Sequence, residues 1–314
     1  MKLGILVVYF AGKDDERLID LHLSELYKNT SVEFTLYCSV NKLHKEFLPK
    51  LKSRSNVVIL DIPPTKLQSS EEHSYYLKYL VERAIKDGCT HLLTLHTDSF
   101  PIKPGWEEKT IPLLSTEHPL LTLAEKSENS RQYTAFFLFL ADFYKKYKPP
   151  FLHDESNLKD DDFQKFVKDY SLNGDSGIMF LYTLYKNGLG WNSIYRTDKN
   201  RSNYIFGLIY DSFLFHLSAS AQYQGEQSAK KISNLGNRVL FVLLDLKNFL
   251  EKIIPINFKG FFFPVLKKYL FGPILIKFKD VLYNDSQSFY RYLETGDERF
   301  LTIKSEKPFI QISD

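Results

Sequence analysis

Short apolar runs alternate with longer amphipathic stretches along the first 220 residues of the chain. Short runs of apolar residues bounded by polar ones are typical of buried strands, and apolar positions three or four residues apart are typical of helices. The runs predict strands at residues 3–10, 32–40, 57–62, 92–95, 120–124 and 136–140. The amphipathic stretches predict helices at residues 14–27, 71–86 and 178–187, the second capped by Ser69 or Ser70 and the third ended by Gly188.

This alternation predicts an α/β fold with a mainly parallel, doubly wound sheet flanked by helices. In such sheets ligands bind just beyond the carboxyl ends of the strands. His96 and Asp98 stand at such an end, directly after the run at 92–95. Pro101 and Gly105 follow and predict a tight loop without regular structure. A carboxylate at this place is suited to hold Mg²⁺ or Mn²⁺ against a phosphate, because these ions prefer oxygen ligands.

The segment from His96 through Asp98 to Gly105-Trp106 resembles the Asp-x-Asp segment of GT-A-fold glycosyltransferases, especially the family 2-like group. In that family the last Asp binds the metal ion that bridges the diphosphate of a sugar nucleotide. Asp98 matches this position, and His96 replaces the first Asp. The structural alternative for Asp98 is an ordinary turn at a strand end.

The resemblance covers roughly residues 3–220 and implies a GT-A-like sheet domain with donor contacts on the loops after its strands. The residues implied to contact the donor, besides His96 and Asp98, are Tyr9, Phe10, Asn41, Asp61 and His73. Tyr9 and Phe10 have an equal alternative as core residues. His73 lies in Glu72-His73-Ser74, similar to a Glu-His-Gly segment of the family, at a predicted helix start whose free N–H groups suit a diphosphate. The two acids at that helix start, however, would repel a phosphate.

Two further segments carry candidate chemistry. Gly174 and Gly177 flank Asp175 ahead of the helix at 178–187. The resemblance implies that Asp175 is the catalytic base of an inverting transfer, which removes the proton of the acceptor hydroxyl; its structural alternative is a helix cap.

The apolar segment 206–216 predicts a strand that delivers His216, preceded by Tyr210-Asp211. In the family, a histidine after a comparable segment completes the metal site, which gives Asp98 and His216 as metal ligands here. Diphosphate oxygens and water would complete an octahedral shell. The alternative is a buried structural histidine.

Composition narrows the class of protein only mildly. The net charge of +3 does not indicate nucleic-acid binding, and the two cysteines, Cys38 and Cys89, have neither metal nor disulfide spacing and indicate a reducing compartment. The apolar start is too short for a signal peptide, and no uncharged run approaches the ~20 residues that span a bilayer. The expected location is cytoplasmic or peripheral on the inner face of the membrane.

The last third of the chain has a different pattern. Residues 230–279 hold ten basic residues and only the acids Asp245 and Glu251, between strongly apolar runs that Pro264 and Pro273 interrupt. This pattern fits segments that lie on an anionic membrane surface. It fits equally well a helical extension packed on the catalytic domain or on a second subunit. The sequence therefore predicts a catalytic domain at 1–224 and a basic, apolar helical extension at 225–314.

Together these features predict a metal-dependent glycosyltransferase. It would move a sugar from a UDP- or GDP-linked donor to a hydroxyl of a glycan or lipid-linked glycan. A nucleotidyltransferase of similar fold is an alternative, although Ala11-Gly12-Lys13 is a poor version of the phosphate loop that such enzymes carry after the first strand. A membrane-associated binding protein without catalysis is another, favoured by His96 in place of the first Asp.

Overall fold

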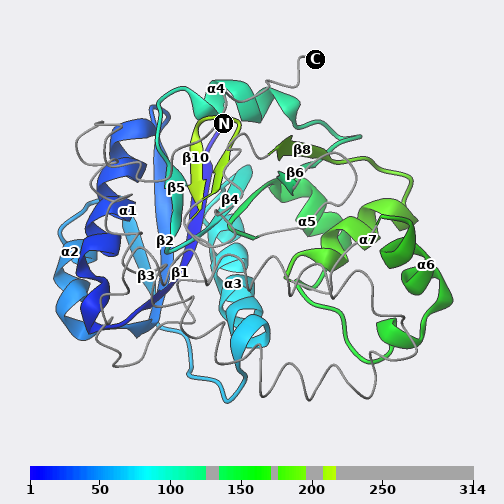
Figure 1. Cartoon of the computed structure of the whole chain (residues 1–314), viewed down its shortest axis with the longest axis horizontal. Helices are drawn as coiled ribbons and strands as arrows, with labels where there is room; N and C mark the ends of the chain where they lie inside the picture. The colour runs from blue at the N-terminus through cyan, green and yellow to red at the C-terminus, as the bar shows by residue number, and fades with distance from the viewer. Residues whose placement is uncertain (125–133, 171–175, 196–207, 217–314) are drawn as a thin grey trace, which may run out of the picture.

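The computed structural model describes residues 1–124, 134–170, 176–195 and 208–216 (Figure 1). Its strands are β1 Leu3–Ala11, β2 Phe34–Leu43, β3 Val57–Leu60, β4 His91–His96, β5 Ser99–Pro101, β6 Leu120–Ala124, β7 Phe136–Leu140, β8 Asn192–Tyr195, β9 Leu208–Tyr210 and β10 Leu214–His216. The α-helices are α1 Glu16–Asn29, α2 Leu48–Lys52, α3 Ser69–Lys86, α4 Trp106–Thr110, α5 Ala141–Tyr147, α6 Asp161–Asp169 and α7 Ile178–Lys186. Short 3₁₀ turns lie at Lys13–Asp15, Lys45–Phe47, Ile111–Leu113 and Asn157–Lys159.

Seven strands form one sheet in the order β3-β2-β1-β4-β7-β6-β8. Strand β7 is antiparallel to both of its neighbours, and the other adjacent pairs are parallel. The predicted α/β fold class, a mainly parallel mixed sheet flanked by helices, is confirmed. Because β1 to β4 run the same way, their carboxyl ends lie at one edge of the sheet, where ligands of α/β proteins bind.

Two apolar cores cover the two faces of this sheet. Strand β1 is apolar almost throughout and buried on both sides, as expected for a central parallel strand. Ile5 and Val7 face the core under α1, α2 and α4, whereas Leu6 and Val8 face the core under α3, α5, α6 and α7. Figure 1 shows these two groups of helices on opposite sides of the strands. Burying each such aliphatic side chain stabilises the fold by roughly 1.5–3 kcal/mol.

A second, three-stranded sheet stands beside the first in the order β5-β10-β9. Strands β9 and β10 form a hairpin whose turn is closed by a hydrogen bond from the Phe213 N–H to the Tyr210 carbonyl, 3.0 Å. Asp211 and Ser212 have φ of 42° and 61°, the backbone of a primed turn that matches the twist of paired strands. The prediction of one continuous strand over 206–216 is therefore wrong; of that range, residues 206–207 lie outside the described part.

The structure corrects several other predicted boundaries. Pro101 was predicted to exclude regular structure, but it is the last residue of the short strand β5. Proline is tolerated at such a strand end. Helix α3 begins at Ser69, after Gln68 as the cap, so neither Ser69 nor Ser70 caps it. Helix α7 ends at Lys186, and Gly188 follows with φ of 64°, as a residue just past a helix end often does. The proposed extension at 225–314 and its basic segment at 230–279 lie outside the described residues.

Candidate metal and donor site

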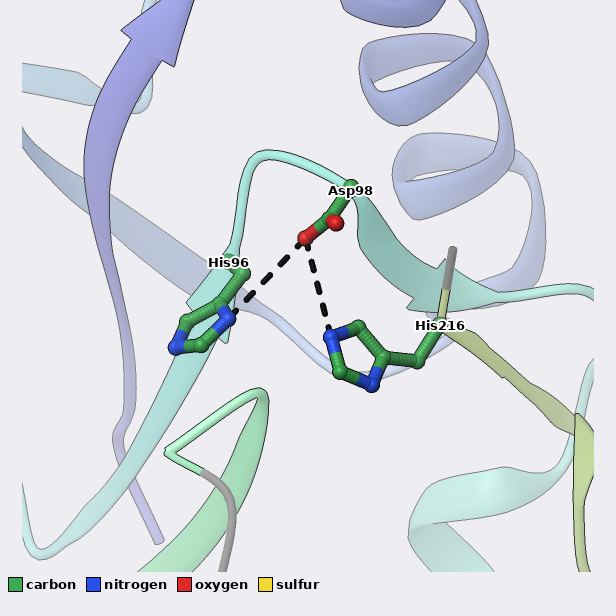
Figure 2. A group of neighbouring side chains, drawn as sticks. All are labelled: His96, Asp98 and His216. Carbon is green, nitrogen blue, oxygen red and sulfur yellow. Dashed lines mark ion pairs between the residues drawn. The ribbon is translucent and has the colours of Figure 1, made fainter. Parts of the chain in front are cut away.

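Three side chains with metal-ligating atoms converge at the carboxyl edge of the sheet: His96, Asp98 and His216 (Figure 2). His96 ends β4, Asp98 lies in the turn between β4 and β5, and His216 ends β10. The Asp98 Oδ1 atom is 3.9 Å from His96 Nδ1 and 3.8 Å from His216 Nε2. One ligand atom from each of the three residues lies within 4.8 Å of the other two.

Strand pairing explains how residues so far apart in sequence meet. His216 pairs with Ser99 in the antiparallel β5–β10 ladder, which sets it beside the turn that carries Asp98. Ser99 also fixes that turn, since its hydroxyl accepts a hydrogen bond from the His96 N–H at 2.8 Å and donates one to the Ala135 carbonyl at 2.5 Å. The Thr97 hydroxyl accepts from the Phe10 N–H at 3.1 Å and so ties the turn to the end of β1. Hydrogen bonds between these two hydroxyls and backbone groups therefore hold the turn on both sides.

Burial controls the charge of the site. The side chains of Asp98 and His216 are 7% and 4% exposed. Burial lowers the pKa of His216 to about 4; the Asp98 carboxylate opposes this shift and His96 adds to it. At neutral pH His216 is therefore uncharged, and a neutral imidazole offers the lone pair that a metal ion requires.

The three atoms fit a divalent ion with a small adjustment. Such an ion lies about 2.1 Å from nitrogen or oxygen ligands, so two ligand atoms around it are at most about 4.2 Å apart. The separations of 3.8 and 3.9 Å from the Asp98 oxygen meet this limit. The widest separation, at most 4.8 Å, can exceed this limit, so an imidazole would have to move closer for all three atoms to bind one ion.

His73 extends the site toward α3. Its ring lies edge-on to the ring of His96, with centroids 4.9 Å apart, and 6.1 Å from the ring of Phe10. Burial, and then the neighbouring His96, lower the pKa of His73 well below its usual value. Its Nε2 atom is buried and has no hydrogen-bond partner among the described residues. Of the two acids at this helix start, Glu72 is buried and pairs with Lys42 at 3.1 Å, so its charge is offset.

The other predicted donor contacts lie at the same edge but differ in exposure. Tyr9 is fully buried against His22 on the α1 side, whereas Phe10 points to the opposite face, beside His73. Asn41 lies within β2 and not after it, and its side-chain amide donates to the Ile62 carbonyl at 2.8 Å. Asp61 is exposed just after β3. The structure thus makes Tyr9 a core residue, and it brings Phe10 to His73.

Asp175 lies outside the described residues, but the chain that follows it is described. The Ser176 hydroxyl is 3.4 Å from the hydroxyl of Ser74, the residue after His73. Gly177, with φ of 99°, donates its N–H to the Phe151 carbonyl at 2.6 Å and leads into α7. The segment after Asp175 therefore enters its helix beside Ser74 of α3.

Two residues of the site were missed from the sequence. Thr134 holds His96, with 2.9 Å between its hydroxyl and His96 Nε2, and an isolated threonine before a strand carries no signal of such a role. His22 on α1 lies behind the Asp98 turn. Burial lowers its pKa to about 4, although Asp98 and the backbone of Thr97 and Ser99 favour its charged form. Its position four residues after Leu18 and four before Leu26, on the apolar face of α1, could have revealed it.

An open pocket of about 760 Å³ runs along α3. Residues of α3 from Ser74 to Ile85 line one wall, and residues from Tyr144 to Leu152 line the other. The side chains of His96, Asp98 and His216 do not line the pocket.

No protein-family model matches the chain, and no curated protein is significantly similar. Among solved structures, mouse xyloside xylosyltransferase 1 is 12% identical over 61% of this chain and 85% of its own, with a TM-score of 0.39. TarS 1–349 of S. aureus in complex with UDP is 14% identical over 56% of this chain, with a TM-score of 0.37, and this chain spans 59% of it. Galactosyltransferase LgtC, in complex with donor and acceptor sugar analogs, is 9% identical over 61% of this chain and 73% of its own, with a TM-score of 0.37. These likenesses concern the fold alone.

Proposed function

We propose that the chain is a metal-dependent glycosyltransferase that moves a sugar from a UDP- or GDP-linked donor to a hydroxyl of a glycan or lipid-linked glycan. The observation that carries this proposal is the convergence of Asp98, His96 and His216 at the carboxyl edge of the sheet. A carboxylate and two imidazoles at this edge suit a cation that faces a diphosphate.

In this proposal Asp98 and His216, with His96 beside them, hold Mn²⁺ or Mg²⁺. When bound, the ion would supply positive charge where the departing diphosphate becomes negative. Phe10 and His73 lie together on the α3 side and offer a ring edge and a buried Nε2 atom to the donor. Asn41, within β2, and Asp61, just after β3, would contact the nucleoside.

The reaction would transfer the glycosyl group in one displacement if it inverts configuration. The acceptor oxygen forms a bond to the anomeric carbon, and the bond from that carbon to the diphosphate oxygen breaks. Asp175 would take the proton of the acceptor hydroxyl. The entry of the chain into α7 beside Ser74 supports this assignment, because it brings the segment after Asp175 to the helix that carries His73.

The loop after β1 argues against nucleotidyl transfer. Enzymes of that class need free N–H groups there for a phosphate. Here the Gly12 N–H donates to the Asp15 carboxylate at 2.7 Å, so a negative charge already lies on the amide that a phosphate would use.

The last third of the chain bears on the acceptor and on the location of the protein. No helix in the described part of the chain is both long and apolar enough to cross a bilayer. Binding of the segment 230–279 to an anionic membrane surface would suit a lipid-linked acceptor and a peripheral site on the inner face of the membrane. Packing of that segment against a second copy would instead give an oligomer.

The test is calorimetric titration of UDP and of GDP, each with and without Mn²⁺, on the wild type, on Asp98→Ala and on Asp142→Asn. Asp142 is an exposed carboxylate that pairs with Lys145 and serves as the matched control. The proposal expects metal-dependent binding of one nucleotide that Asp98→Ala abolishes and Asp142→Asn retains. Release of free sugar from the matching nucleotide sugar would then separate an enzyme from a binding protein. Absence of binding to either nucleotide would sink the proposal for these donors.

A further inference from the structure

We infer that His96 is a direct ligand of the metal ion, positioned by Thr134, and that the resulting pair of imidazoles with one carboxylate selects a transition-metal ion over Mg²⁺. The inference rests on the metal site of the proposed function. It does not depend on the reaction being glycosyl transfer.

The spacing around Asp98 indicates a gap for an ion. A carboxylate that pairs directly with an imidazole forms a hydrogen bond of about 2.7–2.9 Å. The Asp98 oxygen is instead 3.9 Å from His96 Nδ1 and 3.8 Å from His216 Nε2. Both nitrogens face the same carboxylate oxygen (Figure 2). These two separations are therefore too wide for direct hydrogen bonds between the atoms concerned, and we take them as the spacing of three ligands around one ion.

Thr134 gives His96 the orientation that a ligand needs. The hydroxyl of Thr134 lies 2.9 Å from His96 Nε2, on the side of the ring away from Asp98. When Nε2 donates its proton to this hydroxyl, Nδ1 keeps a lone pair directed at the Asp98 side. Thr134 is itself fixed, because it is 2% exposed and its carbonyl accepts a hydrogen bond of 2.6 Å from the Thr94 hydroxyl. Partners of this kind commonly set ring orientation and metal affinity.

The set of donor atoms determines the preferred ion. Imidazole nitrogen suits Zn²⁺, Co²⁺, Ni²⁺ and Fe²⁺, whereas Mg²⁺ prefers carboxylates, carbonyls and water. Mg²⁺ also keeps several waters of its shell, and the side chains of Asp98 and His216 are only 7% and 4% exposed. A carboxylate at residue 96 would give a hard, doubly charged site. His96 supplies an imidazole nitrogen in its place, so the side chains around the ion are one carboxylate and two imidazoles.

The experiment measures binding of the ions alone to the full chain, by calorimetry for Mg²⁺, Mn²⁺, Co²⁺ and Zn²⁺ and by the visible spectrum of bound Co²⁺. We expect Co²⁺ and Zn²⁺ to bind more than about tenfold tighter than Mg²⁺, with Mn²⁺ between them. His96→Asp should weaken Co²⁺ and strengthen Mg²⁺, and it should shift the Co²⁺ spectrum. Equal or tighter binding of Mg²⁺ by the wild type would overturn the inference.

Thr134 is tested by a pair of variants. Thr134→Val keeps the shape and removes the hydroxyl, and it should weaken Co²⁺ by about 10–100-fold. Thr134→Ser restores the hydroxyl and should restore most of the affinity. If Thr134→Val does not fold, His96→Gln, on a ring that is 30% exposed, tests the same ligand. Unchanged Co²⁺ affinity in Thr134→Val or in His96→Gln contradicts the respective role.

The two proposals can fail separately. Tight Co²⁺ binding without nucleotide binding would leave the metal site standing and overturn the transferase. Nucleotide binding that Mg²⁺ supports as well as Co²⁺ would leave the proposed transferase standing and overturn the preference for a transition-metal ion.

Discussion

His216 lies 3.8 Å from Asp98 because it pairs with Ser99, the residue after Asp98, across the β5–β10 ladder. This histidine is therefore positioned by the pairing of two strands and not by a flexible loop. Both residues are buried, so the geometry of the site depends on the small sheet being formed. Changes in the β9–β10 hairpin should act on the site through His216.

The turn of this hairpin offers a first prediction. Ser212 has φ of 61°, a conformation that disfavours residues with a Cβ atom by about 1–2 kcal/mol and that glycine adopts freely. We expect Ser212→Gly to raise the free energy of unfolding by up to about 1 kcal/mol, measured by urea denaturation. Ser212→Val should lower it, because branched side chains tolerate this conformation least. The opposite order of the two variants would show that the turn is not of this type.

A second prediction concerns acid stability. Burial lowers the pKa of His22 to about 4 in the folded state, whereas its ordinary value is 6.5. Between these values the unfolded chain binds a proton that the folded chain does not. The stabilising effect of neutral His22 is complete above pH 6.5 and is lost as the pH falls toward 4.

His22→Phe should remove this effect, since Phe fits between the rings of Tyr9 and Phe100 that His22 contacts. From pH 7 to 4.5 the wild type should lose about 2–3 kcal/mol more of its free energy of unfolding than the variant does. Exposed His118, changed to Gln, is the control. Parallel pH profiles for wild type and His22→Phe would rule out this role.

A third prediction tests a buried carboxylate with a structural task. Glu107 is 1% exposed and accepts hydrogen bonds from the N–H groups of Ser31 and Val32, which fixes the connection between α1 and β2. Glu107→Ala leaves these donors without their partner and should lower the free energy of unfolding by about 2–4 kcal/mol. The neighbouring Glu108 is exposed, and Glu108→Ala should change it by less than about 0.5 kcal/mol. Similar losses in both variants would contradict the assignment.

The strands of the site could be predicted because their apolar runs are short and bounded. Strands β6 and β7 match their predicted ranges, and Asp98 and His216, both predicted as metal ligands, lie close together in the structure. The hairpin was not predicted, because Asp211 and Ser212 lack the glycine that usually marks a primed turn. Nor could it be predicted which of Tyr9 and Phe10 faces the site, since alternation sends neighbours to opposite faces and packing decides which face is which.

The contacts around His96 could not be predicted from the sequence for another reason. Thr134 reaches His96 only because β7 lies antiparallel beside β4, with Phe136 opposite Leu95. That pairing joins segments separated by a long connection, and no local pattern specifies it. His73 could be proposed from its place in α3, but its approach to His96 follows from the packing of α3 on the sheet.

The last prediction separates donor binding from chemistry. If Asp175 removes the proton of the acceptor hydroxyl, Asp175→Asn should lower the rate of transfer by about 10²–10⁴-fold. Metal-dependent binding of the nucleotide should stay within about twofold of the wild type, because the ligands Asp98 and His216 are unchanged. The measurement is single-turnover transfer with the nucleotide sugar identified by calorimetry, beside titration of the nucleotide on the same preparation. Asp169→Asn, at the end of α6, is the matched control. Loss of nucleotide binding in Asp175→Asn would instead make Asp175 part of the donor site. Full transfer by this variant would exclude it as the base and favour a mechanism that retains configuration.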